Sequence, residues 1–144
     1  MDDYQEITKL LYQYGRFIDR GDLDGACQLF EYAKIKTIDR AELGNYRDMA
    51  NMLKKFVRLY EDGTPRTKHL VTNVIIDIDE GGTSANSTAY YTVLQSVTPG
   101  DIKVIAAGQY IDEFERIDGK WRFSYRDLTV FDMQGDISGH LTLT

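Results

Sequence analysis

Histidine is scarce in this chain, and an imidazole base would have to be His69 or His140. A histidine can take up a proton near neutral pH when a carboxylate orients its ring. His69 stands where the chain is expected to enter a long strand. Strict alternation puts it on the same side as Asn73 and Asp77, opposite a wholly apolar side, which favours a surface histidine. A bulge, or a cavity lined by the mixed side, would reverse that interpretation.

Asp19 is the carboxylate that departs most clearly from a local rule. The periodicity predicts that it lies in the last turn of an N-terminal helix, where the helix dipole disfavours an anion. The neighbouring Arg20 is the kind of residue expected there. A local rule broken without visible gain is a flag for function. The alternative is a solvated acid at a helix end, because Asp19 lies off the apolar stripe of the helix.

Two further side chains are candidates for lining a pocket. Tyr14 lies on the apolar stripe of the same helix, so it should point into the interior. Arg126 alternates with Ser124 and Leu128 in the last predicted strand, so it could face inward and bind an anion or a carbonyl. The more common arrangement is an arginine that pairs with an acid on the surface of the sheet.

The sequence carries no signature of a cofactor or a metal. It contains no phosphate-binding loop, zinc-ligand spacing or nucleophile elbow. The two histidines and the single cysteine, Cys27, are far apart in the sequence and lack short ligand spacing. We therefore expect no metal and no cofactor.

Helices must position the candidates in the first half of the chain, because apolar residues recur there at three- and four-residue steps. This spacing predicts helices from about residue 3 to 20, a short one opened by Asp22, and a third from the cap at Asn45 to residue 60. The stretch 32–38 alternates and predicts a strand between the second and third helices.

After Pro65 the period changes to two, which predicts long strands near 70–78, 84–97, 102–117 and 121–131. Turn signals such as Asp118-Gly119 join them, and the tail from Met133 has no clear pattern. Helices followed by hairpin-linked strands indicate an α+β fold. Four such strands must curl, and helices over the concave face would leave a ligand pocket between the layers.

Composition narrows the class of protein. A chain of 144 residues has the size of one domain, so we expect a single domain over residues 1–144. The net charge of −6 argues against nucleic acid and anionic membranes as partners. No apolar run could cross a bilayer, the acidic start lacks a secretory layout, and the lone cysteine fits a reducing compartment. We therefore expect a cytoplasmic protein.

Several motifs together resemble the SnoaL-like branch of the nuclear-transport-factor-two-like superfamily. They are Tyr14-x4-Asp19-Arg20-Gly21-Asp22, His69-x3-Asn73, Gly108-x-Tyr110-x-Asp112-x-Phe114-x-Arg116 and Asp118-Gly119-x-Trp121-x-Phe123. The resemblance covers nearly the whole chain. It implies a cone-shaped, cystatin-like α+β barrel, with N-terminal helices packed on a strongly curved mixed or antiparallel sheet. It does not imply one reaction, because the superfamily spans enzymes, ligand carriers and assembly modules.

The resemblance also implies roles for the candidate residues. Scytalone dehydratase, bile-acid dehydratase and lindane dehydrochlorinase use an Asp–His base, and Asp19 and His69 match those positions. The pair would then meet inside the cone. Tyr14 is similar to the pocket tyrosine of the dehydratases, and Arg126 to an arginine of the dehydrochlorinase. A second pocket histidine of scytalone dehydratase has no equivalent in the middle strands, so the substrate cannot be carried over.

Together these features favour a cofactor-free lyase or isomerase, of the dehydratase or cyclase type, for a medium-sized and mostly apolar cyclic substrate. His69 would remove a proton, Asp19 would fix its tautomer, Tyr14 would donate a hydrogen bond, and Arg126 would bind an anionic end of the substrate. A non-catalytic binding module and an assembly subunit are the alternatives. We expect a homodimer or another homo-oligomer, because large antiparallel sheets leave apolar area on their convex face.

Overall fold

The computed structural model describes residues 1–142, which form three helices and a five-stranded sheet. The helices are α1 (Asp3–Asp19), α2 (Leu23–Gln28) and α3 (Tyr46–Phe56). The strands are β1 (Lys34–Lys36), β2 (Thr67–Ile78), β3 (Ser84–Gln95), β4 (Lys103–Ile117) and β5 (Lys120–Gln134). No helix within residues 1–142 has the length and apolarity needed to cross a membrane.

Polar caps begin all three helices where the sequence predicted them. The Asp2 carboxylate accepts a hydrogen bond from the backbone N–H of Gln5, and Asp22 caps α2 in the same way. Asn45 and Asp48 form a reciprocal capping box at the start of α3. The third helix is shorter than predicted: it ends at Phe56 because Val57 turns to extended backbone and forms a bridge with Leu141.

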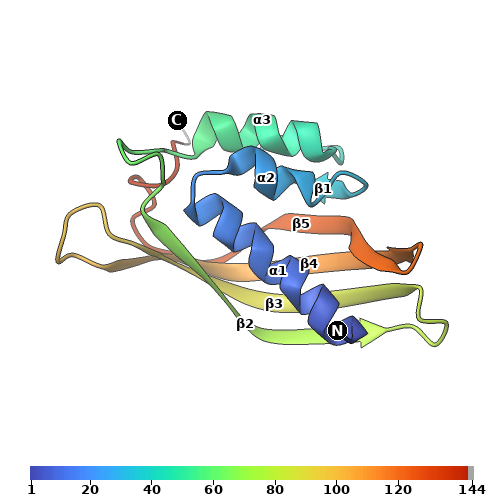
Figure 1. Cartoon of the computed structure of the whole chain (residues 1–144). Coiled ribbons are helices and arrows are strands. Elements are labelled where there is room, and N and C mark those ends of the chain that lie inside the picture. The colour runs from blue at the N-terminus through green and yellow to red at the C-terminus, as the bar shows by residue number, and fades with distance from the viewer. Residues whose placement is uncertain (143–144) are drawn as a thin grey trace.

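The sheet has the strand order β1-β5-β4-β3-β2. The four long strands pair antiparallel through β2–β3, β3–β4 and β4–β5, as the hairpin signals predicted. The short β1 pairs parallel to β5, so the sheet is mixed. Figure 1 shows α1 lying across one face of the curved sheet, with α2 and α3 on the same side. This arrangement confirms the predicted α+β architecture.

The core fills the space between these two layers. It includes apolar side chains from both layers that are almost fully buried: Ile7, Leu11, Ile18, Phe30, Phe114 and Phe123. Phe123 stacks on Phe30 at a centroid distance of 4.2 Å, which joins the last strand to the segment after α2. The helices are therefore held against the sheet mainly by apolar and aromatic contact.

A β-bulge divides strand β2. The pairing register of β2 with β3 shifts between Thr72 and Ile75, and Asn73 has a positive φ of 51°. Before the bulge His69 faces the helices, and after it Val74 and its alternate neighbours do. The bulge therefore reverses the alternation that would otherwise have left His69 on the outer face.

The residues after β5, 135–142, fold back over one end of the sheet, and we call this segment the C-terminal strap. Its backbone pairs with the segment that follows α3. The Arg58 N–H donates to the His140 carbonyl at 2.7 Å, and the Thr142 N–H donates to the Phe56 carbonyl at 2.7 Å. The Gln95 side chain and the Tyr60 hydroxyl both donate to the Gly139 carbonyl. The strap is thus anchored by backbone atoms along its length.

Candidate active site

Asp19 and His69 form a hydrogen-bonded pair between α1 and β2. The Asp19 Oδ1 lies 2.6 Å from His69 Nδ1, and Asp19 Oδ2 accepts a 2.8 Å hydrogen bond from the His69 backbone N–H. Their side chains are only 10% and 8% exposed. The predicted geometry of the pair is confirmed, and both surface alternatives, the solvated helix-end acid and the outward-facing histidine, are excluded.

The close approach of α1 to β2 depends on a glycine. A Cβ at Gly15 would lie 2.9 Å from His69 Cβ, which is closer than real side chains allow. Since Gly15 lies one turn before Asp19, its missing side chain lets the end of α1 settle directly on the start of β2. This contact brings the carboxylate within reach of the imidazole.

Hydrogen bonds hold Asp19 in its ionised form. Burial acts to raise the pKa of Asp19, but the hydrogen bonds and charge of His69, with a 2.8 Å bond from the Thr67 hydroxyl, outweigh burial and lower it. An ionised carboxylate only accepts hydrogen bonds, so the proton between the pair lies on His69 Nδ1. His69 Nε2 is then the basic nitrogen of the ring.

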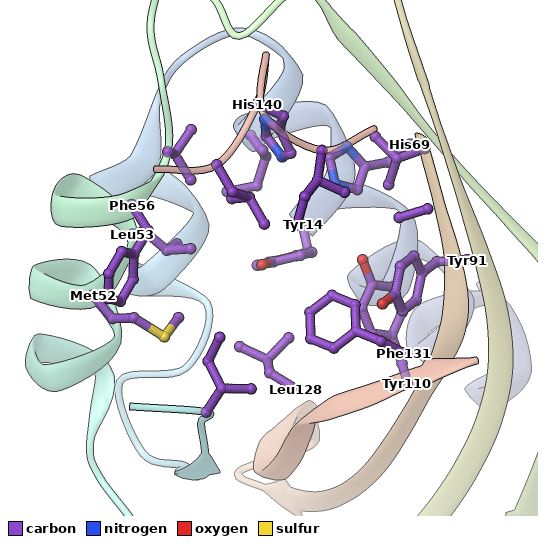
Figure 2. A pocket seen from close by; sticks show the side chains of 17 residues that line it. Tyr14, Met52, Leu53, Phe56, His69, Tyr91, Tyr110, Leu128, Phe131 and His140 are labelled. Carbon is purple, nitrogen blue, oxygen red and sulfur yellow. The ribbon is translucent and has the colours of Figure 1, made fainter. Parts of the chain in front are cut away.

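His69 borders a mostly apolar cavity of about 110 Å³ between α1, α3, the sheet and the C-terminal strap (Figure 2). Its wall includes the side chains of Tyr14, Met52, Leu53, Phe56, Tyr91, Tyr110, Leu128, Phe131 and His140. Ligand pockets typically measure about 300–1,000 Å³. The cavity is therefore small compared with a typical ligand pocket.

Tyr14 lies where the sequence placed it, on the inner stripe of α1 and in the cavity wall. Its ring packs edge-on against Tyr110 at a centroid distance of 5.8 Å, and Tyr110 stacks on Tyr91 at 4.7 Å. Burial raises the pKa of Tyr14 despite the nearby Arg126 charge. The hydroxyl is therefore a hydrogen-bond donor throughout the neutral pH range.

Arg126 requires a correction to the predicted site. It faces inward, which is one of the two orientations that the sequence left open, but it is fully buried and is not among the residues of 1–142 that line the cavity. Its guanidinium donates two hydrogen bonds to Asp112, at 2.7 and 2.9 Å. The ion pair uses the charge inside the core, so Arg126 is not placed to bind a substrate anion directly.

The arginine instead lies behind two tyrosines of the cavity wall. Its guanidinium carbon is 4.0 Å from the Tyr110 ring centroid and 4.6 Å from that of Tyr14. Burial acts to lower the pKa of Arg126, but the Asp112 carboxylate outweighs burial and raises it. Arg126 therefore stays charged, and its guanidinium packs against the rings of Tyr14 and Tyr110.

The sequence did not identify His140 as part of the site. It lies on the C-terminal strap, and its ring centroid is 6.1 Å from that of His69. No periodicity marks this part of the chain, and His140 lies 71 positions after His69. The one usable signal was composition, since His140 was the only other imidazole in the sequence.

Within residues 1–142, no three His, Cys, Asp or Glu side chains are grouped closely enough to hold a metal ion. The polar groups at the cavity are instead imidazoles and phenols, on a wall that is otherwise aliphatic and aromatic. Such a site can move a proton and hydrogen-bond to an uncharged oxygen.

Solved structures share this fold. A protein of unknown function from Mycobacterium tuberculosis is 24% identical, with a TM-score of 0.67 over 89% of this chain and 71% of that one. A candidate scytalone dehydratase from Novosphingobium aromaticivorans is 21% identical, with a TM-score of 0.64 over 89% of this chain and 83% of that one. A cystatin-like protein of unknown function from Nostoc punctiforme is 20% identical, with a TM-score of 0.70 over 94% and 95%.

These likenesses establish the cystatin-like fold. No relative with a curated description matches the chain in sequence. The SnoaL-like domain matches residues 1–127, which include the three helices, strands β1 to β4 and the first part of β5. The chain therefore belongs to the SnoaL-like domain family.

Proposed function

We propose that this protein is a lyase or isomerase of the dehydratase or cyclase type, which uses His69 as a general base. The observation that carries the proposal is the Asp19–His69 pair, with 2.6 Å between Oδ1 and Nδ1, at the wall of an apolar cavity. A structural ion pair would gain nothing from bordering a cavity. A general base must border one, because it has to reach the proton that it removes.

In the proposed step, His69 Nε2 takes a proton from a carbon next to a carbonyl. The C–H bond breaks, and its electron pair moves to form an enolate whose charge lies on the oxygen. Asp19 stabilises the imidazolium that forms, as the carboxylate does in other Asp–His pairs. If the carbon next to the deprotonated one carries a hydroxyl, the imidazolium returns its proton to that hydroxyl, the C–O bond breaks and water leaves, which completes an elimination. If no such hydroxyl is present, the imidazolium returns the proton to a different atom of the enolate, which completes an isomerisation.

Tyr14 is the proposed donor to the oxygen that gains charge. Its hydroxyl stays protonated, so it can donate a hydrogen bond to that oxygen, and the guanidinium of Arg126 packs 4.6 Å behind its ring and supports its position. The role first expected for Arg126 is accordingly replaced by an indirect one. The fold shared with a candidate scytalone dehydratase agrees with a dehydratase, but the proposal depends on the site residues alone.

A non-catalytic binding module remains the second candidate, and the cavity favours it. A volume of about 110 Å³ is small for turnover of a medium-sized substrate. The two candidates differ in whether His69 removes protons, which can be measured without knowing the natural substrate.

The test is solvent exchange on 2-indanone, a small neutral ketone of two fused rings whose CH₂ groups are acidified by the carbonyl. Deuterium uptake in D₂O is followed by NMR, with and without a chelator, and the two rates are expected to agree. Wild type should accelerate exchange above the uncatalysed rate. His69→Ala should lower this acceleration by about 10²–10⁴-fold, and Asp19→Asn should also be severe, because an amide cannot stabilise the imidazolium.

The double variant should be scarcely worse than His69→Ala, because the two residues act as one unit. Tyr14→Phe should cost less, and Tyr12→Phe, an exposed tyrosine on the same helix, is its matched control. Losses that multiply independently would contradict the pair. Binding of 2-indanone without any exchange above background would favour the binding module instead.

A further inference from the structure

His140 carries a buried polar atom that the fold does not use. The residue is 7% exposed, and its Nδ1 has no hydrogen-bond partner within residues 1–142. A buried nitrogen without a partner costs about 1–3 kcal/mol, so native proteins rarely keep one without a reason. The ring lies on the cavity wall, near His69 (Figure 2).

The strap does not need this side chain for its own anchoring. The His140 carbonyl accepts from the Arg58 N–H, and the His140 N–H donates to the Ile137 carbonyl. Gly139 and Thr142 fix the strap on either side, also through their backbone atoms. A leucine of similar size would serve the same packing at lower cost, which leaves the imidazole without a structural explanation.

The ring is uncharged under ordinary conditions. Burial, with a smaller effect from the nearby His69, lowers the pKa of His140 to about 4. A neutral imidazole donates one hydrogen bond and accepts another, and it attracts no anion. It therefore suits a carbonyl or hydroxyl oxygen rather than a carboxylate.

The rest of the cavity points to the same class of ligand. Among residues 1–142, no lysine or arginine lines it, and Asp112 neutralises the nearby Arg126. The wall consists of aliphatic side chains, aromatic rings and the two imidazoles. An anion would lose its water without gaining a cation, so an uncharged molecule is favoured.

We infer that His140 is a ligand-binding residue that hydrogen-bonds to an oxygen of an uncharged, oxygenated ring, and so sets the chemical class of the substrate. The inference rests on the proposed function in treating the cavity as a substrate site. Its test measures binding alone, so it can fail or succeed whether or not His69 is a base.

The experiment compares three probes of similar shape: 2-indanone, its oxygen-free analogue indane, and indane-2-carboxylate. Dissociation constants are measured by NMR titration for wild type, His140→Leu and His140→Asn. In His140→Leu, binding of 2-indanone should weaken about five- to tenfold, the equivalent of one neutral hydrogen bond. Binding of indane should change less than about twofold, and the carboxylate should bind weakest throughout. His140→Asn, which keeps a polar side chain at this position, should lie between.

Leu141→Ala is the matched control, because Leu141 lines the cavity from the same strap but offers no polar atom. It should weaken 2-indanone and indane alike. In wild type, the imidazole ¹⁵N shifts of His140 should respond to 2-indanone and not to indane, which tests the contact without any mutation.

The thermal midpoint separates binding from folding. His140→Leu should unfold at the wild-type temperature or above it, because the variant removes an unpaired polar group. Equal weakening of both neutral probes, or unchanged binding of 2-indanone with unchanged ¹⁵N shifts, would overturn the inference. Tighter binding of the carboxylate than of 2-indanone would overturn the assigned class of ligand.

Discussion

At the scale of single residues, Asp19 shows why a local rule can be broken. An anion in the last turn of a helix costs about 0.3–1 kcal/mol against the dipole. Here the carboxylate accepts hydrogen bonds from the His69 ring, the His69 backbone and the Thr67 hydroxyl. A hydrogen bond to a charged group contributes about 1.5–3 kcal/mol, so these contacts outweigh the dipole. The same contacts orient the imidazole.

The lowered pKa of His140 predicts how the free energy of unfolding depends on pH. Its pKa is about 4 in the folded protein and 6.5 in the unfolded chain. Between these values the unfolded chain binds the proton and the folded protein does not, so stability falls as the pH drops from about 6.5 to 4, by at most about 3 kcal/mol. His69 and Asp19 face the ring, and Asp19 titrates below this window because its pKa is lowered from 3.8.

Urea unfolding of wild type and His140→Leu at several pH values between 7 and 4.5 checks this expectation. The leucine variant should lose less stability across the window. Leu141→Ala should run parallel to wild type, at lower stability. Equal slopes for wild type and His140→Leu would show that the histidine is solvated or paired in solution.

At the scale of elements, the contact between α1 and β2 determines the site. Alanine in place of glycine normally stabilises a helix interior by about 1 kcal/mol. At Gly15 the added Cβ would lie 2.9 Å from His69 Cβ, so the clash should reverse that sign. A displacement of 1 Å at a catalytic group costs about 10²-fold in rate. Gly15→Ala should therefore lower 2-indanone exchange by at least about tenfold, without the usual gain in stability.

Gly81→Ala is the control for this substitution. A Cβ there would have its nearest neighbours at 3.8 Å, an ordinary contact distance. It should leave both exchange and urea stability close to wild type. If Gly15→Ala behaves in the same way, then the helix can shift freely and the close approach does not fix the pair.

The helices and strands were largely predictable from the sequence. The surroundings of Arg126 and His140 were not, for different reasons. The caps at Asp2, Asp22 and Asn45 are local signals, so the sequence predicted where the helices begin. The sequence left open whether Arg126 faces inward, because β5 shifts its register between Phe123 and Tyr125, and its partner Asp112 lies on the neighbouring strand at a register that periodicity cannot give. His140 depends on a strap whose position is determined by backbone pairing with Arg58 and Phe56, which leaves no side-chain pattern.

At the scale of the whole molecule, the outer face of the sheet carries apolar side chains. Ile75 on β2 and Ile111 on β4 are 62% and 38% exposed, and both pair with Thr88 of β3 between them. Tyr90 and Val104 are also more than half exposed. Exposed apolar side chains gathered on one face of a sheet often mark an interface, which agrees with the expectation of a homodimer.

Light scattering at micromolar concentration should give about twice the chain mass of 16.5 kDa. Ile75→Lys with Ile111→Lys should shift the mass toward one chain, because charge on this face opposes association. The same change at Tyr12, exposed on α1, should leave the mass unchanged. A monomer for the wild-type protein would contradict the expectation.

The bulge at Asn73 has a consequence for comparing this chain with its relatives. Because it adds one residue to β2, the strand contains two inward-facing frames that are out of step. An alignment without a gap against a strand lacking the bulge can match His69 or the apolar residues from Val74 onward, but not both. A relative could therefore be wrongly scored as lacking the histidine, and alignments of this strand should allow a single-residue gap at Asn73.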